Sequence, residues 1–391
     1  MEVMQLPQGR RVATARRSLT GGWALVSALG VLLGMAPAAS WMTWAVHAAE
    51  CGSRGEACHG RAGRPLHVPG EFRSVQDAID AAPDGATILI AAGFYRESFR
   101  VEGKRLQIIG SDDGRAEITA PGPDVMLATY ANGGGGELKG LFFRGGDCAV
   151  CGIYDGSSIP SALVVKDVTM ADGYRGVFGG FSSLILKNVT VFGTRWHGIS
   201  ITHVGVELKF EDIEVHDTGG VGLLVFNAGP GDIDIGGHFH DNAKGGLEII
   251  GHNGAINLVF VVADHNPEFG VFLFEANAGM TLSDLSSNGH STPTGCHGAG
   301  LLVEQSSVVA VTGTVFSANC LGIYDSGSTV AIGSDIFDSN AADLGHEPGL
   351  PSSIDDLGNN VCGENLGSPN ETLHACQDLT LDLQPPSPDN P

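Results

Sequence analysis

A glycine followed by a branched aliphatic residue recurs through the middle of the chain. The eight pairs are Gly152-Ile153, Gly176-Val177, Gly198-Ile199, Gly222-Leu223, Gly246-Leu247, Gly270-Val271, Gly300-Leu301 and Gly322-Ile323. Subtracting neighbouring glycine numbers gives steps of 24, 22, 24, 24, 24, 30 and 22 residues. A repeat of this length predicts stacked supersecondary units, each of which buries its apolar face against its neighbours.

Within each repeat, apolar and polar residues alternate in short runs. One unit contains Leu184-Ile185-Leu186, Val189-Thr190-Val191 and Gly198-Ile199-Ser200-Ile201. Such runs indicate strands with one buried face. Three of them in about 22–24 residues predict an all-β fold, a single-stranded right-handed parallel β-helix with three short strands per coil. Small polar residues four positions before the glycine, such as Thr218, Asn242 and Asn266, predict a stacked turn.

The ends of the array differ from its middle. A capping-box serine, Ser74, is followed by apolar residues at helical spacing, which predicts a short N-terminal capping helix through Ala82. We therefore expect the β-helix over residues 71–345, after a linker at 50–70. The period is lost beyond it, so 346–391 are expected to be a C-terminal segment with a Pro-rich, disordered tail.

Residues 1–49 have the features of an export signal. Four arginines precede an uncharged, mostly apolar stretch from Gly21 to Ala49, and Arg16-Arg17 resembles a twin-arginine signal. The signal predicts an exported protein, whether periplasmic, cell-surface or secreted. The stretch is also long enough to span a bilayer, so an uncleaved membrane anchor is the alternative.

All eight cysteines follow this leader, and an even count in an exported chain favours disulfides over metal thiolates. Pairs compatible with their order are Cys51–Cys58, Cys148–Cys151, Cys296–Cys320 and Cys362–Cys376, with other connectivities left open. For Cys148 and Cys151 the alternative is a redox-active pair, although no thioredoxin-like βαβ pattern surrounds them.

The composition narrows the range of partners. The chain has 391 residues, 58 of them glycine, and its 44 acidic and 21 basic side chains give a formal net charge of −23. This acidity excludes nucleic acid, whose phosphates need a basic surface. It is typical of a well-solvated exported protein, and it also suits a protein that binds cations.

One segment near the N-terminus carries a family resemblance. Residues 74–110 read SVQDAIDAAPDGATILIAAGFYRESFRVEGKRLQIIG. The segment resembles the opening of pectin-lyase-like β-helix proteins, which include pectin methylesterases and NosD-like carbohydrate-binding and sugar-hydrolase proteins. The resemblance implies a right-handed parallel β-helix and an extracellular or cell-wall polysaccharide as partner.

The sequence departs from these enzymes where their chemistry lies. Residues 140–144 resemble a pectin methylesterase strand, but the Gln and the two Asp segments that such esterases carry have no match. The DPHD-type motif of alginate epimerases is absent as well. Esterase activity is therefore not expected, and if the protein is an enzyme we expect a polysaccharide lyase or hydrolase.

One set of polar residues follows the repeat. His216, His240 and Asp264 occupy one outward position on three successive coils, and Glu214 and His238 lie two residues earlier on the same face. Coils lie about 4.8 Å apart. These residues predict either a site for a zinc-like divalent cation, at His216, His238 and His240, or catalytic acid/base groups, at His216, His240 and Asp264. An exposed polar face without a site is the alternative.

A second candidate site precedes two successive repeat glycines. Removing a proton from an acidic sugar needs a base and a cation that stabilises the enolate. Arg195 and His197 are candidate catalytic residues, and Arg175 and Trp196 are candidate substrate-binding residues. The alternative for the arginines is a surface ion pair.

An outward strip is unexpectedly apolar. Alternation places Leu224, Phe226, Ile250, Phe272, Phe274 and Tyr324 on the outside of the coils. Either another segment covers this strip, for which the C-terminal segment and the insertion at 286–297 are candidates, or the strip binds a ligand. In the second case its four aromatic residues are candidates for stacking on sugar rings.

The sequence as a whole predicts an exported β-helix protein that acts on or binds a polysaccharide. The alternative is a non-catalytic surface protein whose repeats present an adhesive or shielding face. The sequence does not decide between catalysis and binding, nor does it give the oligomeric state.

Overall fold

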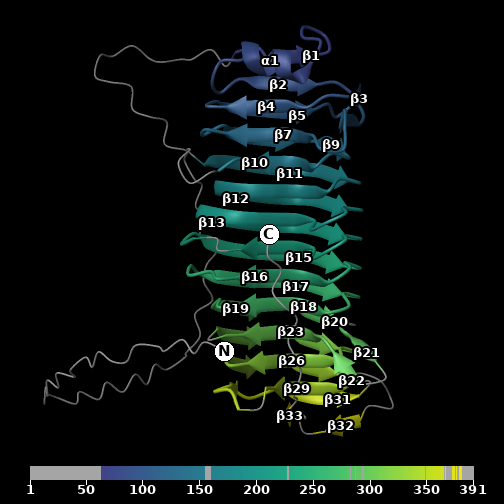
Figure 1. Ribbon diagram of the computed structural model, residues 1–391, viewed down its shortest axis with the longest axis vertical. Coiled ribbons are helices and arrows are strands. Elements are labelled where there is room, and N and C mark those ends of the chain that lie inside the picture. Colours follow the sequence, from purple (N-terminus) through teal and green to yellow (C-terminus); the bar gives the residue numbers. More distant parts are fainter. Residues whose placement is uncertain are drawn as a thin grey trace, which may run out of the picture. The chain divides into compact units, whose positions relative to one another are not determined.

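The repeats form the coils of one right-handed parallel β-helix of about 12 turns (Figure 1). The computed structural model describes residues 63–364, with gaps at 155–159, 227–228, 282, 287, 293–294, 306 and 348, and also 366, 372–374, 376 and 378–380. The predicted export signal and most of the linker, with Cys51 and Cys58, lie outside the described residues. No helix in the described part is long and apolar enough to cross a membrane.

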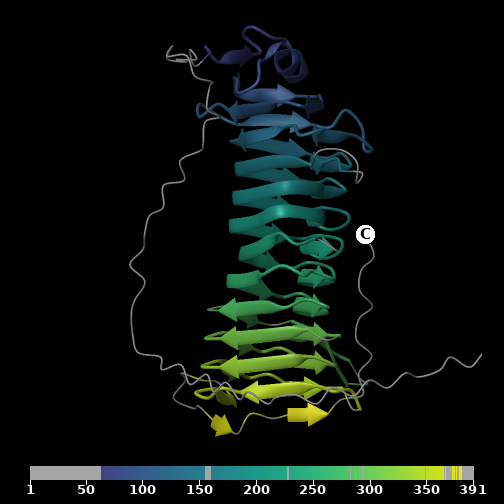
Figure 2. The same ribbon diagram turned by 90° about the vertical axis from the view of Figure 1, so that its left-hand side faces the viewer.

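Backbone pairing sorts the strands into three parallel stacks, which Figure 2 shows from the side. The first stack, which contains the repeat glycines, consists of β4 (Phe99–Glu102), β7 (Met126–Ala131), β10 (Cys148–Gly152), β14 (Leu223–Phe226), β16 (Gly245–Ile250), β18 (Phe269–Phe274), β23 (Ala299–Glu304), β26 (Leu321–Ser326), β29 (Ala342–His346) and β33 (Asp378–Thr380). The second consists of β1 (Leu66–Val68), β2 (Thr87–Ile90), β5 (Arg105–Gly110), β8 (Gly135–Lys139), β19 (Ala278–Thr281), β24 (Val308–Thr312), β27 (Thr329–Gly333) and β30 (Ser353–Asp356). The third consists of β3 (Gly93–Tyr95), β6 (Ala116–Thr119), β9 (Leu141–Arg144), β20 (Asp284–Ser286), β25 (Val315–Ser317), β28 (Ile336–Asp338) and β31 (Val361–Glu364).

Longer strands turn the corners and contribute to more than one stack. They are β11 (Ser161–Ala171), β12 (Arg175–Phe192), β13 (Ile199–His216), β15 (Asp232–His240) and β17 (Ile256–Asp264). Two pairings in the described residues are antiparallel: β21 (His290–Thr292) with β22 (Gly295–His297), and β31 with β32 (Thr372–His374). Three strand segments per coil are therefore confirmed.

The core is built from columns of apolar side chains inside the coil. Val191 pairs with Val215, and Val215 with Phe239, each one coil further along. All three are completely buried. Each such side chain stabilises the stack by roughly 1.5–3 kcal/mol relative to an exposed one. The repeat period of the sequence thus becomes a continuous interior.

The repeat glycines mark places where neighbouring coils approach too closely for a side chain. A Cβ on Gly222 would lie 2.7 Å from the carbonyl oxygen of Gly246, and one on Gly246 would lie 2.6 Å from that of Gly270. None of these three glycines has a left-handed backbone conformation. Close packing of one coil on the next, and not the backbone angle, therefore requires glycine at this position.

The β-helix extends beyond the expected range of 71–345. It begins with Leu66 in β1, and β30 and β31 continue the second and third stacks as far as Glu364. The sequence period is lost earlier because Asp343 takes the place of the repeat glycine, opposite Gly322 of the preceding coil.

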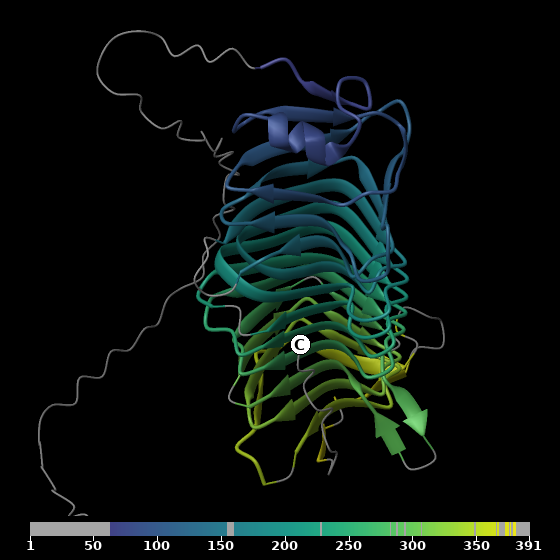
Figure 3. The same ribbon diagram turned by 45° about the horizontal axis from the view of Figure 1, so that its top comes forward.

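A short helix, α1 (Val75–Ala81), lies across the N-terminal end of the stack (Figure 3). The Ser74 hydroxyl accepts a hydrogen bond from the Asp77 backbone N–H at 3.1 Å, which caps the first turn. Val75, Ala78 and Ile79 are buried on the side that faces the core. The predicted capping helix is confirmed.

The predicted stacked turn is a ladder of buried asparagines. The backbone N–H of Asn242 donates to Oδ1 of Asn266, and that of Asn266 donates to Oδ1 of Asn288, at 3.2 and 3.3 Å. Nδ2 of Asn266 also donates to the carbonyl oxygen of Phe239 at 3.0 Å. Each side chain therefore satisfies backbone groups that the turn would otherwise leave unpaired.

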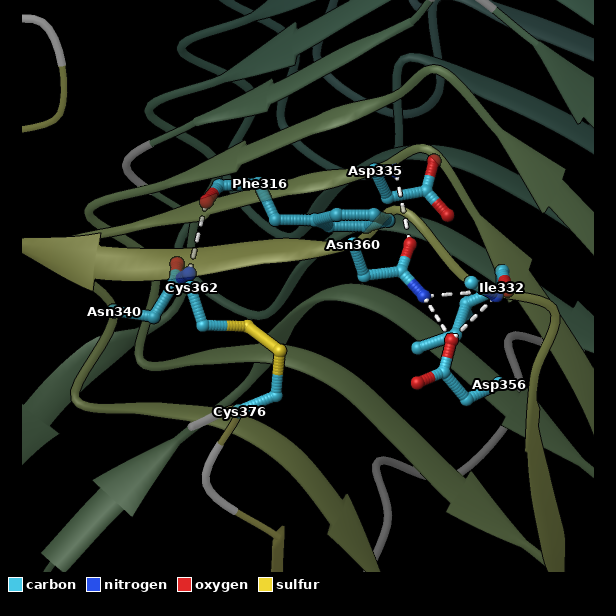
Figure 4. The surroundings of a disulfide bond; sticks show 9 residues. Phe316, Ile332, Asp335, Asn340, Asp356, Asn360, Cys362 and Cys376 are labelled. Carbon is cyan, nitrogen blue, oxygen red and sulfur yellow. Dashed lines mark hydrogen bonds between the residues drawn. A yellow bond between two sulfur atoms is a disulfide. The ribbon is translucent and has the colours of Figure 1, made fainter. Parts of the chain in front are cut away.

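Two of the expected disulfides are present among the described cysteines. Cys148 is joined to Cys151 within β10, and Cys362 is joined to Cys376 near the C-terminal end of the stack (Figure 4). Cys320 is also disulfide-bonded. The side chain of Cys296 lies outside the described part, so the pair Cys296–Cys320 stays a prediction.

Candidate functional site

The outer face of the third stack carries a column of rings at the end of successive strands. Phe192 pairs with His216, His216 with His240, and His240 with Asp264. The ring of Phe192 stacks on His216 with centroids 5.3 Å apart, and His216 stacks on His240 at 4.9 Å. The structure therefore brings together His216, His240 and Asp264, as the spacing of 24 predicts.

The neighbouring column adds Glu214 and His238 to this cluster. Glu214 pairs with His238 of the next coil. The ring centroids of His238 and His240 are 4.1 Å apart. Nε2 of His238 donates to Oδ2 of Asp264 at 3.0 Å. Oε1 of Glu214 lies 3.6 Å from Nε2 of His240. We call Glu214, His216, His238, His240 and Asp264 the histidine cluster.

An aspartate directly after each column histidine holds its ring. Nδ1 of His216 donates to Asp217 at 2.7 Å, and Nδ1 of His240 donates to Asp241 at 2.8 Å. Both aspartates have positive φ values, 53° and 52°, a conformation that Asp tolerates better than most residues. The turn of the chain thus places a carboxylate behind each imidazole.

These contacts change the ionisation of the cluster. Burial lowers the pKa of His240, but the carboxylates of Asp241 and Glu214 outweigh this effect and raise it above the ordinary imidazole value. Burial raises the pKa of Asp264, but hydrogen bonds from His265 and His238 hold it below its usual range. The carboxylates therefore favour the protonated form of His240, and the imidazole hydrogen bonds favour the ionised form of Asp264.

A hollow of about 510 Å³ adjoins the cluster at His238. Three consecutive coils line it where the second stack bends into the third, with residues 209–213 and 234–238 and with Asn257, Val259 and Phe260. The Phe260 ring is 64% exposed, and Lys209, Glu211 and Asp234 bring charges to the rim. The hollow combines an apolar wall with polar groups, as small-ligand sites do.

The second candidate group forms an aromatic and cationic platform beside the first stack. Tyr174 and Trp196 stack across neighbouring coils with ring centroids 6.0 Å apart. The guanidinium of Arg195 lies 5.8 Å from the Tyr174 ring, and that of Arg175 lies 4.1 Å from the Phe178 ring. Arg195 is exposed, while Arg175 and Trp196 are half-buried. Arg175, Arg195 and Trp196 are thus close together, and Tyr174 joins them although the sequence did not single it out.

His197 has different surroundings from the residues next to it. Its side chain is 1% exposed, and its Nδ1 accepts a hydrogen bond from the backbone N–H of Val221 at 3.0 Å. The ring is thus buried in the turn, where it bonds the backbone of the next coil. His197 therefore contributes to the contact between the two coils, and the catalytic role expected for it stays a prediction.

The outward apolar strip of the first stack is largely buried. Phe272 and Tyr324 are 1% and 2% exposed and belong to a second hydrophobic cluster, and Phe226 and Phe274 are half-buried. Phe272 and Tyr324 have no exposed ring face for a sugar. Phe272 and Tyr324 are buried among apolar side chains of the first stack itself, and the expectation that another segment covers the strip stays a prediction.

Two acidic residues interrupt this apolar strip and were not singled out from the sequence. Glu248 and Glu304 are 1% and 3% exposed. Burial and the nearby Glu347 raise the pKa of Glu304 to about 8. The signal that could have found them is a carboxylate at an outward position beside apolar residues of the same column. Glu248 lies between Leu224 and Phe272, and Glu304 lies between Phe274 and Ser326.

The architecture places the chain among right-handed parallel β-helix proteins, and solved structures share it. The periplasmic alginate epimerase AlgG is similar with a TM-score of 0.51 and 15% identity, over 76% of this chain and 84% of that one. The A-module of a mannuronan C-5 epimerase from Azotobacter vinelandii is similar with a TM-score of 0.54 and 15% identity, over 80% and 93%. No family model and no curated protein matches the sequence. At such identities the likeness is one of fold.

Proposed function

We propose that this protein is exported and acts on an extracellular polysaccharide at the outer face of the third stack. The observation that carries the proposal is the continuous column of rings, Phe192, His216 and His240, which ends beside a hollow at His238. Ring faces suit sugar rings, and imidazoles exchange protons near neutral pH. His216, His240 and Asp264 are therefore the proposed acid/base groups.

The platform of Tyr174, Trp196, Arg175 and Arg195 supports an acidic sugar as the substrate. An exposed guanidinium pairs with a sugar carboxylate, and it also stabilises an enolate if a proton is removed beside that carboxylate. Trp196 belongs to the turn that follows Phe192, so one ring of the platform and one ring of the column lie on consecutive parts of the chain. A long polymer suits such an extended surface better than a small ligand does.

The two similar structures favour the same class of substrate. Their names describe enzymes that act on alginate and on mannuronan. These polymers are therefore the first to test. A non-catalytic, adhesive function is the alternative, and binding without any product would support it.

The test is a screen of the purified protein against alginate, mannuronan, a pectin and a neutral glucan. Binding is measured by affinity electrophoresis, and turnover by unsaturated products, reducing ends and a change in sugar configuration. We expect Trp196→Ala to weaken binding by about tenfold, the value of one stacking contact of 1–1.5 kcal/mol. A combined His216→Ala, His238→Ala and His240→Ala variant should lose turnover.

The matched control is Val308→Ala, which removes a 57% exposed side chain from the second stack. It should bind and turn over polysaccharide like the parent protein. Failure of every polymer to bind, or equal binding by Trp196→Ala, would contradict the proposed function.

A further inference from the structure

We propose that Glu214, His238 and His240 form a binding site for one divalent cation of the zinc class, open to the hollow beside it. The site lies on the proposed binding face. A role for the ion in polysaccharide chemistry rests on the proposed function, whereas the binding of the ion itself does not. The ligand set differs from the one expected from the sequence, because Glu214 takes the place of His216.

The first observation is convergence of the three side chains. One ligand atom from each of Glu214, His238 and His240 lies within 4.8 Å of the other two. In a tetrahedral zinc site, with bonds of about 2.1 Å, ligand atoms lie roughly 3.4 Å apart. The separation of 3.6 Å between Glu214 Oε1 and His240 Nε2 already approaches this value. The other separations, which are at most 4.8 Å, must shorten by side-chain rotation when an ion binds.

The second observation concerns the ring nitrogens of His240. Asp241 accepts a hydrogen bond from Nδ1 at 2.8 Å, so the proton that a metal ion displaces from the ring is the one on Nε2. Once that proton has left, Nε2 offers its lone pair to the ion while Nδ1 stays bonded to Asp241. Nε2 is buried and has no hydrogen-bond partner among the described residues. A buried nitrogen without a hydrogen-bond partner, aimed at a carboxylate, is the arrangement that a metal ion satisfies.

His238 also has one ring nitrogen bonded to a carboxylate. Its Nε2 donates to Oδ2 of Asp264 at 3.0 Å, so Nδ1 is the nitrogen that a metal ion would take. Each imidazole of the site therefore has a carboxylate behind it, Asp241 for His240 and Asp264 for His238. Such pairs fix the ring orientation and increase the basicity of the nitrogen that binds the metal.

The parallel coils hold the ligands in place before an ion binds. His238 and His240 project from the same face of β15, two residues apart, and Glu214 projects from β13 in the adjacent coil. Three protein ligands leave a fourth position for water or a substrate oxygen. An ion there would polarise a sugar carboxylate or generate a hydroxide near neutral pH. In that form the ion and Asp241 engage both nitrogens of His240, so the hydroxide would replace His240 as the proposed base.

His216 provides an internal comparison. Its ring is stacked 4.9 Å from that of His240 and its Nδ1 is bonded to Asp217, as in the ligand residues. It nevertheless lies outside the convergent set. Replacing it with phenylalanine keeps a ring in the stack, next to Phe192, and removes both nitrogens.

The test is isothermal titration of the chelator-treated full chain with Zn²⁺, with Co²⁺ absorption as the probe of coordination geometry. We expect one equivalent to bind, with the intense visible bands of a tetrahedral Co²⁺ site. His238→Ala and His240→Ala should each weaken affinity by more than about 100-fold. His216→Phe should change it by less than about twofold. Circular dichroism and thermal unfolding confirm that each variant is folded.

A second variant tests the carboxylate behind the ring without removing a ligand. Asp241→Asn keeps a residue that tolerates the positive φ of 52° and should weaken Zn²⁺ binding by about 10–100-fold. The proposal is overturned if the parent protein binds no stoichiometric Zn²⁺, or if His216→Phe weakens binding as much as His240→Ala does.

The metal site and the proposed function can be refuted independently of each other. Stoichiometric Zn²⁺ binding without binding of any polysaccharide supports the metal site and contradicts the proposed function. Polysaccharide binding by a folded protein that binds no Zn²⁺ supports the proposed function and contradicts the metal site.

Discussion

The imidazole of His216 lies face to face with that of His240, with ring centroids 4.9 Å apart and an angle of 8° between the ring planes. This distance is close to the spacing of neighbouring strands, about 4.8 Å. The stacking is therefore set by the backbone, since any two residues in register on adjacent coils meet at this separation. A chemical group repeated at the coil period becomes a row of like groups in contact.

The repeat glycines allow a direct test of coil packing. We expect Gly246→Ala to lower the free energy of unfolding by about 1–3 kcal/mol, because its Cβ would lie 2.6 Å from the carbonyl oxygen of Gly270. Gly279→Ala in β19 is the control, since a Cβ there meets nothing within 4 Å, and it should change stability by less than about 0.5 kcal/mol. Urea unfolding followed by circular dichroism measures both. Equal effects would mean that intrinsic backbone preference, and not coil contact, selects glycine.

The asparagine ladder makes a second prediction. Asn266→Ala removes the acceptor of the Asn242 backbone N–H and the donor to Phe239, which leaves buried polar groups unpaired. We expect a loss of about 2–4 kcal/mol in the free energy of unfolding. Asn257→Ala, which removes an exposed amide paired with Asp234, should cost less than about 0.5 kcal/mol. A small effect of Asn266→Ala would show that water replaces the ladder.

Much of this architecture is visible in the sequence, and the reason is physical. A parallel coil converts a period of 24 residues into spatial register, so that His216, His240 and Asp264 could be placed in one column from their numbers alone. The capping helix was equally accessible, because the Ser74 cap and the apolar spacing after it are local signals.

Other features depend on contacts that no period encodes. The sequence could not tell that the His197 ring turns inward to bond Val221, or that Glu304 is buried on an outward position. The sequence also does not show whether Glu214 or His216 is the third ligand of the proposed cation site, since both lie on the same face. That choice depends on the directions of side chains, which differ within one column.

The buried carboxyl of Glu304 predicts a dependence of stability on pH. Its pKa is raised from 4.5 to about 8 by burial and by Glu347, so the folded protein holds a proton that the unfolded chain has lost. Stability should therefore be greatest below about pH 4.5 with respect to this group and should fall as pH rises towards 8. Glu304→Gln should remove this slope and stabilise the protein at pH 8 by up to a few kcal/mol, on the order of the shift.

Thermal unfolding of the parent protein and of Glu304→Gln between pH 5 and pH 8 measures the difference. Groups apart from Glu304 and its neighbour Glu347 titrate alike in both proteins, so the difference reports on this pair. Parallel curves would contradict the assignment of a buried, protonated carboxyl.

The two disulfides are expected to differ in how much they stabilise the folded protein. Mass mapping without reduction should find Cys148–Cys151, Cys362–Cys376 and the untested pair Cys296–Cys320. Removing Cys362–Cys376, whose residues are 14 apart, should cost roughly 3 kcal/mol, whereas the bond between residues three apart closes too short a loop to constrain the unfolded chain much. Denaturation of the two double alanine variants checks the order, and free thiols at all these positions would contradict an oxidising compartment.

Export makes the final prediction. N-terminal sequencing of the secreted protein should begin near Ala49, because the apolar stretch before it has the form of a cleaved signal. A mature chain that retains Gly21 to Ala49 would support the membrane-anchor alternative.

The hairpin of β21 and β22 occupies the one long repeat step, between Gly270 and Gly300. The strands on either side of it, β20 and β23, still pair in register with β25 and β26 of the next coil. The turn after the third stack therefore accommodates extra chain without changing which residues meet across coils. Insertions at this turn, which follows the third stack with its histidine cluster, can therefore change during evolution without altering the pairing of the coils.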